Sequence, residues 1–133
     1  MKRVWLNGCF DVLHRGHIEM VKYAREVGDY VVVGTDTDAR INESKGNTRP
    51  INTLEDRIEI LRSIKYIDHV VSFDSDEELI DHLKFYKPDH RILGSEYKNS
   101  GKIVGEDFSG DILFFDRIEQ YSSTDTIKEM NKK

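Results

Sequence analysis

Short apolar runs and longer amphipathic stretches alternate along this chain, from its first residues almost to its last. Runs rich in β-branched residues predict buried strands, and stretches with an apolar residue every three or four positions predict amphipathic helices. We expect strands at 3–7, 30–35, 69–73, 90–94 and 111–115. We expect helices at 17–27, 53–64 and 75–86, and a short final helix from about 123.

Local signals mark the ends of several helices. Gly28 follows the first helical stretch and predicts its end. Thr53 and Asp56 have the spacing of a capping box, in which two side chains satisfy free backbone N–H groups. Ser75 stands where a residue would cap the next helix. The polar stretch 36–52 predicts mostly loop, with one helical turn near 38–42.

Alternating strands and helices predict an α/β fold of the Rossmann-like, doubly wound kind. We expect a five-stranded parallel sheet with helices on both faces, in a single domain over residues 1–133. In such folds, ligands bind in the crevice at the carboxyl ends of the strands. Unusually polar segments follow four of the expected strands, at 8–17, 35–38, 94–97 and 117–124. Their convergence on one edge of the sheet predicts a binding site there.

Composition excludes several classes of function. The chain of 133 residues has 20 Lys and Arg against 25 Asp and Glu, a net charge of −5. General nucleic-acid binding depends on broad basic surface, so we expect no nucleic-acid partner. Cys9 is the only cysteine, which leaves no intrachain disulfide and no cysteine-based metal cluster. No apolar run has the length of a signal peptide or a membrane span, so we expect a cytoplasmic protein without a membrane partner.

The segment 8–17, Gly-Cys-Phe-Asp-Val-Leu-His-Arg-Gly-His, carries the most chemical information. It lies between a strand and a helix, where backbone N–H groups and the helix dipole favour a phosphate. His14 and His17 can face the same way, and Gly16 lets a phosphate approach the backbone. Two imidazoles there can stabilise charge that develops during reaction. The alternatives are capping or packing roles, or a zinc site, but no His-Glu-x-x-His motif or cysteine set accompanies them.

This segment resembles the signature of the His-x-Gly-His nucleotidyltransferase superfamily, in its cytidylyltransferase-like branch. Two further segments resemble the same branch. One runs from Lys45-Gly46 through Arg49-Pro50-Ile51-Asn52 to Asp56-Arg57. The other, 117–124, is similar to the branch's second signature, usually Arg-x-x-x-x-Ser-Thr-Thr. The order and spacing of the three agree over essentially the whole chain.

The resemblance implies that a phosphate oxygen of an acceptor attacks the α-phosphorus of a nucleoside triphosphate and that pyrophosphate leaves. It implies catalytic roles for His14, His17, Lys45 and Arg117. It implies nucleotide binding by Gly8, Cys9, Phe10, Gly16, Ser122, Ser123 and Thr124. It places Asp11 and Arg57 on the acceptor side. Mg²⁺ would enter with the triphosphate, without metal ligands from the protein.

Three positions depart from the usual pattern of the branch. Cys9 stands where many members have Thr, and we interpret it as a small residue of the turn. Ser123 replaces a Thr but keeps the hydroxyl. Lys45 is a single lysine where glycerol-3-phosphate cytidylyltransferases carry a pair. The alternative for Arg57 is a solvated helix face, because acidic residues surround it in the sequence.

Two substrate pairs remain open within this reaction. The first choice is transfer of CMP from CTP to glycerol 3-phosphate, which gives CDP-glycerol. The alternative is transfer of AMP from ATP to a sugar 1-phosphate, as in ADP-heptose formation, because 45–52 and 94–105 resemble that group equally. A non-catalytic nucleotide-binding module is a second class, and a flavodoxin-like redox domain a third. The resemblance also implies a homodimer and a role in cell-surface polysaccharide biosynthesis.

Overall fold

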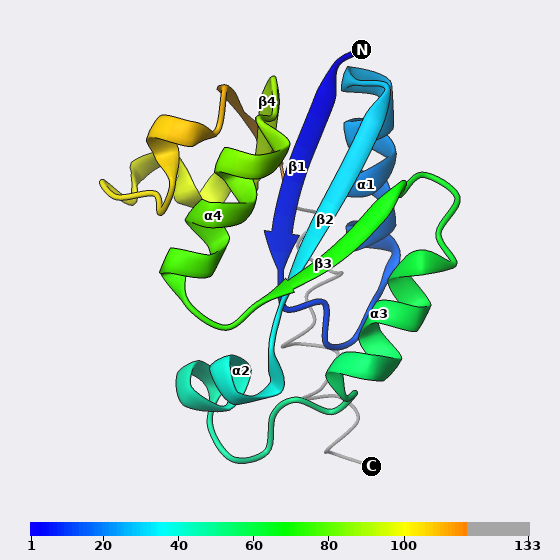
Figure 1. Cartoon of the computed structure of the whole chain (residues 1–133). Helices are drawn as coiled ribbons and strands as arrows, with labels where there is room; N and C mark the ends of the chain where they lie inside the picture. Colours follow the sequence, from blue (N-terminus) through cyan, green and yellow to red (C-terminus); the bar gives the residue numbers. More distant parts are fainter. Residues whose placement is uncertain (117–133) are drawn as a thin grey trace.

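Five parallel strands form one twisted sheet in the order β3-β2-β1-β4-β5 (Figure 1). The structure is a computed structural model, and it describes residues 1–116. The strands are β1 (Arg3–Gly8), β2 (Tyr30–Asp36), β3 (His69–Phe73), β4 (His90–Gly94) and β5 (Asp111–Phe115). The α/β, Rossmann-like fold predicted from the alternating pattern is therefore confirmed.

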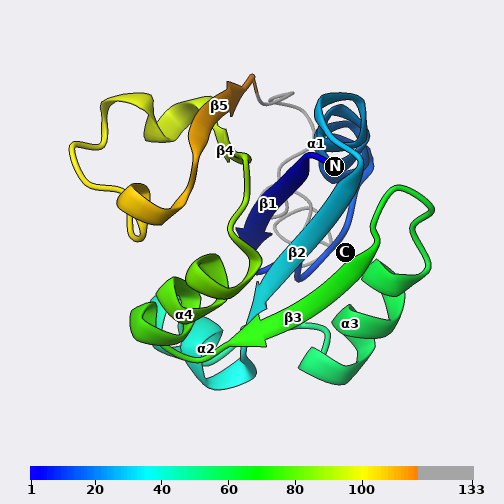
Figure 2. The same cartoon turned by 45° about the horizontal axis from the view of Figure 1, so that its top comes forward.

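Helices cover both faces of the sheet, as Figure 2 shows. They are α1 (Arg15–Val27), α2 (Asp38–Lys45), α3 (Leu54–Arg62) and α4 (Asp76–Tyr86), with the short 3₁₀ turns η1 (Ser95–Asn99) and η2 (Glu106–Phe108). Buried residues of α1 and α3, such as Val21 and Leu61, pack on one face of the sheet. Leu79 and Leu83 of α4 pack on the other.

Most element boundaries match the sequence pattern, and the differences lie where polar residues take part in the structure. The capping by Thr53 and Ser75 is present, since their hydroxyls accept from Asp56 N and Glu78 N. The stretch 36–52, expected to be mostly loop, contains the eight-residue helix α2. Its one buried residue is Ile41, so it offers no apolar stripe that a pattern search could detect. The final helix expected from about 123 lies outside the described residues.

Residues of β1 alternate between the two layers, and this alternation organises the site. Val4 and Leu6 belong to the core under α1 and α3, whereas Trp5 belongs to the core under α4. Gly34 on the neighbouring strand gives the indole its space, because a Cβ atom there would lie 2.7 Å from the Trp5 ring. Asn7 has the same parity as Trp5 and therefore also faces the α4 layer.

Candidate active site

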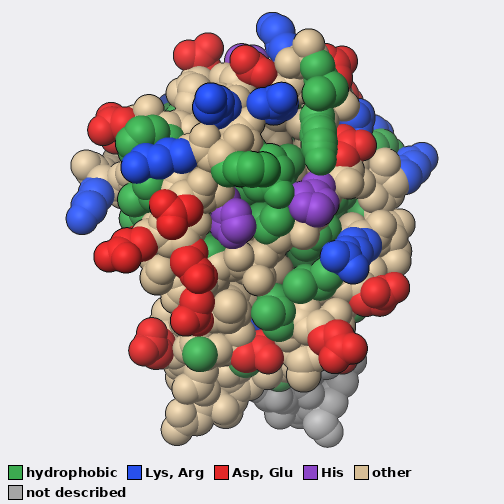
Figure 3. Space-filling model, viewed as in Figure 1, with side chains coloured by type: hydrophobic (Ala, Val, Ile, Leu, Met, Phe, Trp, Pro, Cys, Tyr) green, Lys and Arg blue, Asp and Glu red, His purple; other side chains and the backbone are tan. Residues whose placement is uncertain are grey.

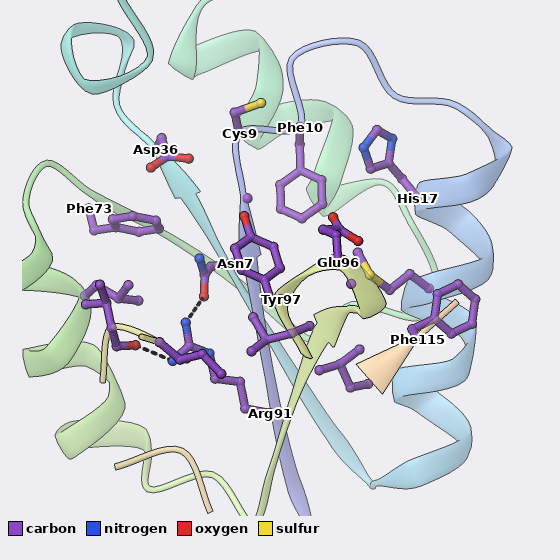
Figure 4. A pocket seen from close by; sticks show the side chains of 18 of the residues that line it. Asn7, Cys9, Phe10, His17, Asp36, Phe73, Arg91, Glu96, Tyr97 and Phe115 are labelled. Atoms are coloured by element: carbon purple, nitrogen blue, oxygen red, sulfur yellow. Dashed lines mark hydrogen bonds between the residues drawn. The ribbon is translucent and has the colours of Figure 1, made fainter. Parts of the chain in front are cut away.

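A cavity of about 470 Å³ opens at the carboxyl ends of the strands, around the point where β1 lies between β2 and β4. This is the switch point at which doubly wound sheets bind ligands. Close-up sticks in Figure 4 show side chains from several elements directed toward this space. Its lining includes Asn7, Gly8, Cys9, Phe10, His14, Gly16, His17, Asp36, Arg40, Lys45, Phe73, Leu79, Arg91, Glu96, Tyr97, Lys102, Val104 and Phe115.

The two histidines cap α1 and line the cavity at the same time. His14 is the N-cap residue, and its Nδ1 accepts from the backbone N–H of Gly16 at 3.0 Å. His17 reaches back, and its Nδ1 accepts from the backbone N–H of His14 at 3.2 Å. A neutral imidazole that accepts at Nδ1 carries its proton on Nε2, so each ring is assigned as an Nε2–H donor. Each ring can therefore cap α1 through Nδ1 and still donate from Nε2, so the capping alternative does not exclude the site hypothesis.

Phe10 is held in an unusual backbone conformation beside these rings. Its φ is +49°, in the left-handed region that a bulky residue rarely adopts. Its side chain is buried and packs edge-on against the His17 ring, with centroids 5.5 Å apart. Such conformations cost about 1–3 kcal/mol and concentrate at functional sites. Phe10 thus helps to fix the orientation of the His17 imidazole.

Charged side chains from β2 and α2 form the opposite wall. Asp36, at the end of β2, accepts from Arg40 Nε at 2.8 Å. Burial raises the pKa of Asp36 even though Arg40 bonds to it. Lys45 is the last residue of α2 and is exposed at the cavity. Lys45 therefore lines the same cavity as His14 and His17, and the catalytic role that the resemblance implies for it stays a prediction.

Asp11 lies behind the cavity, in contact with the segment 49–52. It is buried, and it accepts from Arg49 Nε at 2.6 Å and from the backbone N–H groups of Ile51 and Asn52 at 2.8 and 2.9 Å. Burial alone would raise the pKa of Asp11, but the N–H groups of Asn52 and Ile51 and the Arg49 guanidinium together hold it below its ordinary value. Asp11 therefore anchors this segment, and direct contact with a substrate stays a prediction.

Because the pKa of Asp11 is lowered in the folded protein, we expect the free energy of unfolding to decrease at low pH. The contribution is fully present above the ordinary value of 3.8 and disappears as the pH falls through the lower, folded-state pKa. Asp11→Asn leaves the Arg49 charge buried without its partner, so we expect a loss of about 3 kcal/mol at pH 7. Urea unfolding should show the gap between wild type and variant shrinking below about pH 4. A gap that stays constant down to pH 3 would contradict this role.

Arg57 is fully buried and joins three parts of the site from behind. Its Nη1 donates to Cys9 O at 2.9 Å, to Thr35 Oγ1 at 2.8 Å and to Asp36 O at 2.7 Å. The alternative of a solvated helix face is therefore wrong. Arg57 is not part of the cavity lining, and contact with the acceptor phosphate stays a prediction.

Sequence reasoning missed several residues that line the cavity. Asn7 and Arg91 lie inside strands, where periodicity assigns them to the sheet and to nothing else. Glu96 and Tyr97 come from η1, and Lys102 from the following turn. Two sequence signals could have found these residues. Asn7 directly precedes the segment 8–17, and Arg91 is a charged residue in an otherwise apolar run.

Part of the expected site lies beyond the described residues. Arg117, Ser122, Ser123 and Thr124 fall in the range 117–133, so their roles stay predictions.

Among residues 1–116, no group of three His, Cys, Asp or Glu side chains could hold a metal ion. Over the same range, no helix combines the length and the apolar character needed to cross a membrane. On the face shown in Figure 3, Lys and Arg side chains are interspersed with Asp and Glu.

Comparison with known proteins gives the relatives of this chain. The family model described as "Cytidylyltransferase-like" matches residues 5–129. The "Bifunctional protein HldE" of Campylobacter concisus is 40% identical over 97% of this chain, and that of Helicobacter hepaticus is 38% identical over 98%. The chain spans only 27% of the length of each of these relatives.

Solved structures share the fold. The lipopolysaccharide core biosynthesis protein from Thermoplasma volcanium has a TM-score of 0.73 and 25% identity, covering 92% of this chain and 99% of that one. Pantoate-beta-alanine ligase from Francisella tularensis, complexed with an ATP analogue and beta-alanine, has a TM-score of 0.63 and 20% identity. It covers 98% of this chain and 69% of that one, and at this identity it shows the fold alone.

Proposed function

Because the chain belongs to the cytidylyltransferase-like family and is a nucleotidyltransferase, we propose that it transfers AMP from ATP to a sugar 1-phosphate of the heptose type. The product would be an ADP-sugar, with pyrophosphate released. The observation that carries this choice is the 40% identity to the bifunctional HldE protein along 97% of the chain. It supports the ADP-heptose alternative over CTP and glycerol 3-phosphate, the first choice of the sequence analysis.

In the proposed reaction, an oxygen of the acceptor phosphate attacks the α-phosphorus of ATP. A new P–O bond forms as the bond to the β-phosphate bridging oxygen breaks, and that electron pair leaves with pyrophosphate. His14 and His17 donate from Nε2 to phosphate oxygens whose charge grows in the transition state. The amino end of α1 adds its dipole in the same place. Lys45, at the opposite wall, would neutralise charge on the acceptor or the phosphates.

Mg²⁺ fits this site as a companion of the triphosphate. The lining carboxylates of Asp36 and Glu96 come from different elements, and Asp36 is already bonded to Arg40. Mg²⁺ keeps several waters and favours substrate phosphates over cages made entirely by protein. When bound, it would neutralise charge on the phosphates. A homodimer, a cytoplasmic location and a role in lipopolysaccharide biosynthesis complete the proposal, and the likeness to the Thermoplasma lipopolysaccharide core biosynthesis protein supports the last.

Pyrophosphate release over a grid of substrates tests the proposal. ATP and CTP are each combined with heptose 1-phosphate and with glycerol 3-phosphate, in the presence of Mg²⁺. We expect release with ATP and heptose 1-phosphate, and release lowered by about 10²–10³-fold with the His14→Asn variant, which controls for contaminating enzymes. Release only with CTP and glycerol 3-phosphate would overturn the choice of base and acceptor. No release with any pair would instead favour a non-catalytic nucleotide-binding module.

A further inference from the structure

Trp5, Asn7 and Arg91 form a connected group on the α4 side of the cavity. The indole Nε1–H of Trp5 donates to Asn7 Oδ1 at 2.9 Å. Arg91 Nη2 donates to the same oxygen at 3.1 Å, across the β1–β4 pair. Both acceptor positions of the amide oxygen are thereby used.

Two donors on one oxygen fix the orientation of the Asn7 amide. A flipped amide would place its NH₂ group against two N–H donors, so the oxygen must face Trp5 and Arg91. In Figure 4 the nitrogen of Asn7 is turned away from Arg91. Because Asn7 lines the cavity, a ligand there meets a fixed pair of N–H donors and no free acceptor.

Arg91 is an unusual residue to hold the Asn7 amide in place, because buried arginines are normally paired with a carboxylate. Its side chain is almost fully buried, with a residue exposure of 3%. Within residues 1–116 it forms no ion pair, and its Nε has no hydrogen-bond partner. Nη1 donates to two neutral oxygens, Val104 O and Ser109 Oγ. Burial lowers the pKa of Arg91 to about 10, so it remains charged at neutral pH.

A buried cation held only by neutral oxygens is costly, and one change at position 7 would relieve it. An aspartate there would still accept from both Trp5 and Arg91 and would also neutralise the guanidinium charge. The chain has an amide instead, which keeps the Nδ2 donors at the cavity and leaves the charge without a counter-charge among residues 1–116. Residues that reduce stability in this way are typical of binding sites.

We propose that Asn7 is a specificity-determining residue that donates to an oxygen of the phosphorylated acceptor, and that Trp5 and Arg91 are its positioning residues. The saturated Oδ1 cannot join the paired donor and acceptor contact by which an amide recognises adenine. Asn7 also faces α4, whereas His14 and His17 hold the phosphates at α1 on the other side. Phe73 and Leu79 give this half of the cavity apolar walls suited to the carbon skeleton of a sugar phosphate. The inference rests on the proposed function for the identity of the two substrates.

Asn7→Asp is the decisive variant, because it removes the donors but keeps both bonds to the oxygen. We expect the KM for heptose 1-phosphate to rise about tenfold or more and the KM for ATP to stay within about twofold. We also expect the melting temperature to stay the same or rise, because Arg91 gains a counter-charge. Asn99→Asp is the matched control, since it adds the same charge at an exposed position of η1 outside the lining. It should leave both KM values unchanged.

A double-mutant cycle separates positioning from general packing. Arg91→Lys should raise the acceptor KM several-fold in the wild-type background, because the orientation of the amide is lost. In the Asn7→Asp background the same change should have no further effect on that KM. Equal effects in both backgrounds would overturn the positioning role.

Direct binding distinguishes failure of this inference from failure of the proposed function. Ligand-observed NMR with heptose 1-phosphate and with glycerol 3-phosphate measures acceptor binding without turnover. Weaker binding of either to Asn7→Asp supports the inference even if wild type releases no pyrophosphate. A turnover-competent wild type whose Asn7→Asp variant keeps normal acceptor binding would overturn the inference and leave the proposed function intact. A raised KM for ATP alone, or no binding of either acceptor to wild type, would also overturn it.

Discussion

Replacing His14 with asparagine is expected to lower kcat/KM for nucleotidyl transfer by about 10²–10³-fold while the fold stays intact. Asparagine is among the best N-cap residues, and its side-chain oxygen can accept from the backbone as His14 Nδ1 does now. The variant therefore keeps the cap of α1 and loses the Nε2–H donor. Pyrophosphate release measures the first effect, and thermal unfolding measures the second.

His17→Gln is the matched variant for the second ring. A glutamine three residues after the N-cap can reach back to the N-cap N–H group, which His17 Nδ1 bonds in the structure. We expect a similar loss of activity and little change in melting temperature. His14→Ala, in contrast, should also lose about 1 kcal/mol of stability, because it removes the cap. Near-normal turnover in His14→Asn or His17→Gln would restrict that histidine to its structural role.

Patterns that repeat along the chain predicted the framework well. Apolar runs located every strand within residues 1–116 to within a residue, because strands buried on both faces are rich in apolar residues. The helices α1, α3 and α4 followed from their apolar faces and their caps. Helix α2 was predicted only as a single turn near 38–42, because it covers the edge of the site and buries only Ile41.

The site residues that belong to a sequence motif could be predicted. The residues that meet only through tertiary contacts could not. The segment 8–17 located His14, His17 and Phe10 at the cavity from their place between a strand and a helix. Nothing local shows that Asn7 and Arg91 meet, because their contact depends on the crossover that places β4 beside β1. A charged residue in a buried strand is the signal that could have found Arg91.

Arg57 shows how local sequence can mislead. Its acidic neighbours are exposed on α3, which suggested a solvated face, but Arg57 itself points inward and is fully buried. Its Nε donates to Asn52 O at 3.1 Å, so the same side chain also holds the segment anchored by Asp11. Two of the backbone oxygens that it bonds, Cys9 O and Asp36 O, lie at the ends of β1 and β2, where the sheet can no longer satisfy them.

Arg57→Met is therefore expected to cost about 4 kcal/mol of unfolding free energy or more, a large share of the total for a domain of this size. The thioether fills a similar volume but removes the donor to Asp36 O and to Thr35 Oγ1, while Cys9 O keeps only the Thr35 hydroxyl. Asp38→Asn provides the control, because the Asp38 carboxylate that Arg57 contacts is 47% exposed. Solvent screens a carboxylate exposed to this extent, and asparagine keeps the Oδ1 acceptor for Arg57 Nη2, so that variant should lose far less stability than Arg57→Met. Urea titration at neutral pH gives both values.

Arg57→Lys distinguishes this bracing role from direct contact with the acceptor. Lysine keeps the charge but cannot bond Cys9 O, Asp36 O and Asn52 O together, since it lacks the forked geometry of the guanidinium. A brace predicts a clear loss of stability, with kcat and both KM values changing together as the ends of β1 and β2 loosen. A substrate contact predicts a rise confined to the acceptor KM with stability unchanged, because a lysine can still attract a phosphate. The burial of Arg57 behind the cavity wall favours the first outcome.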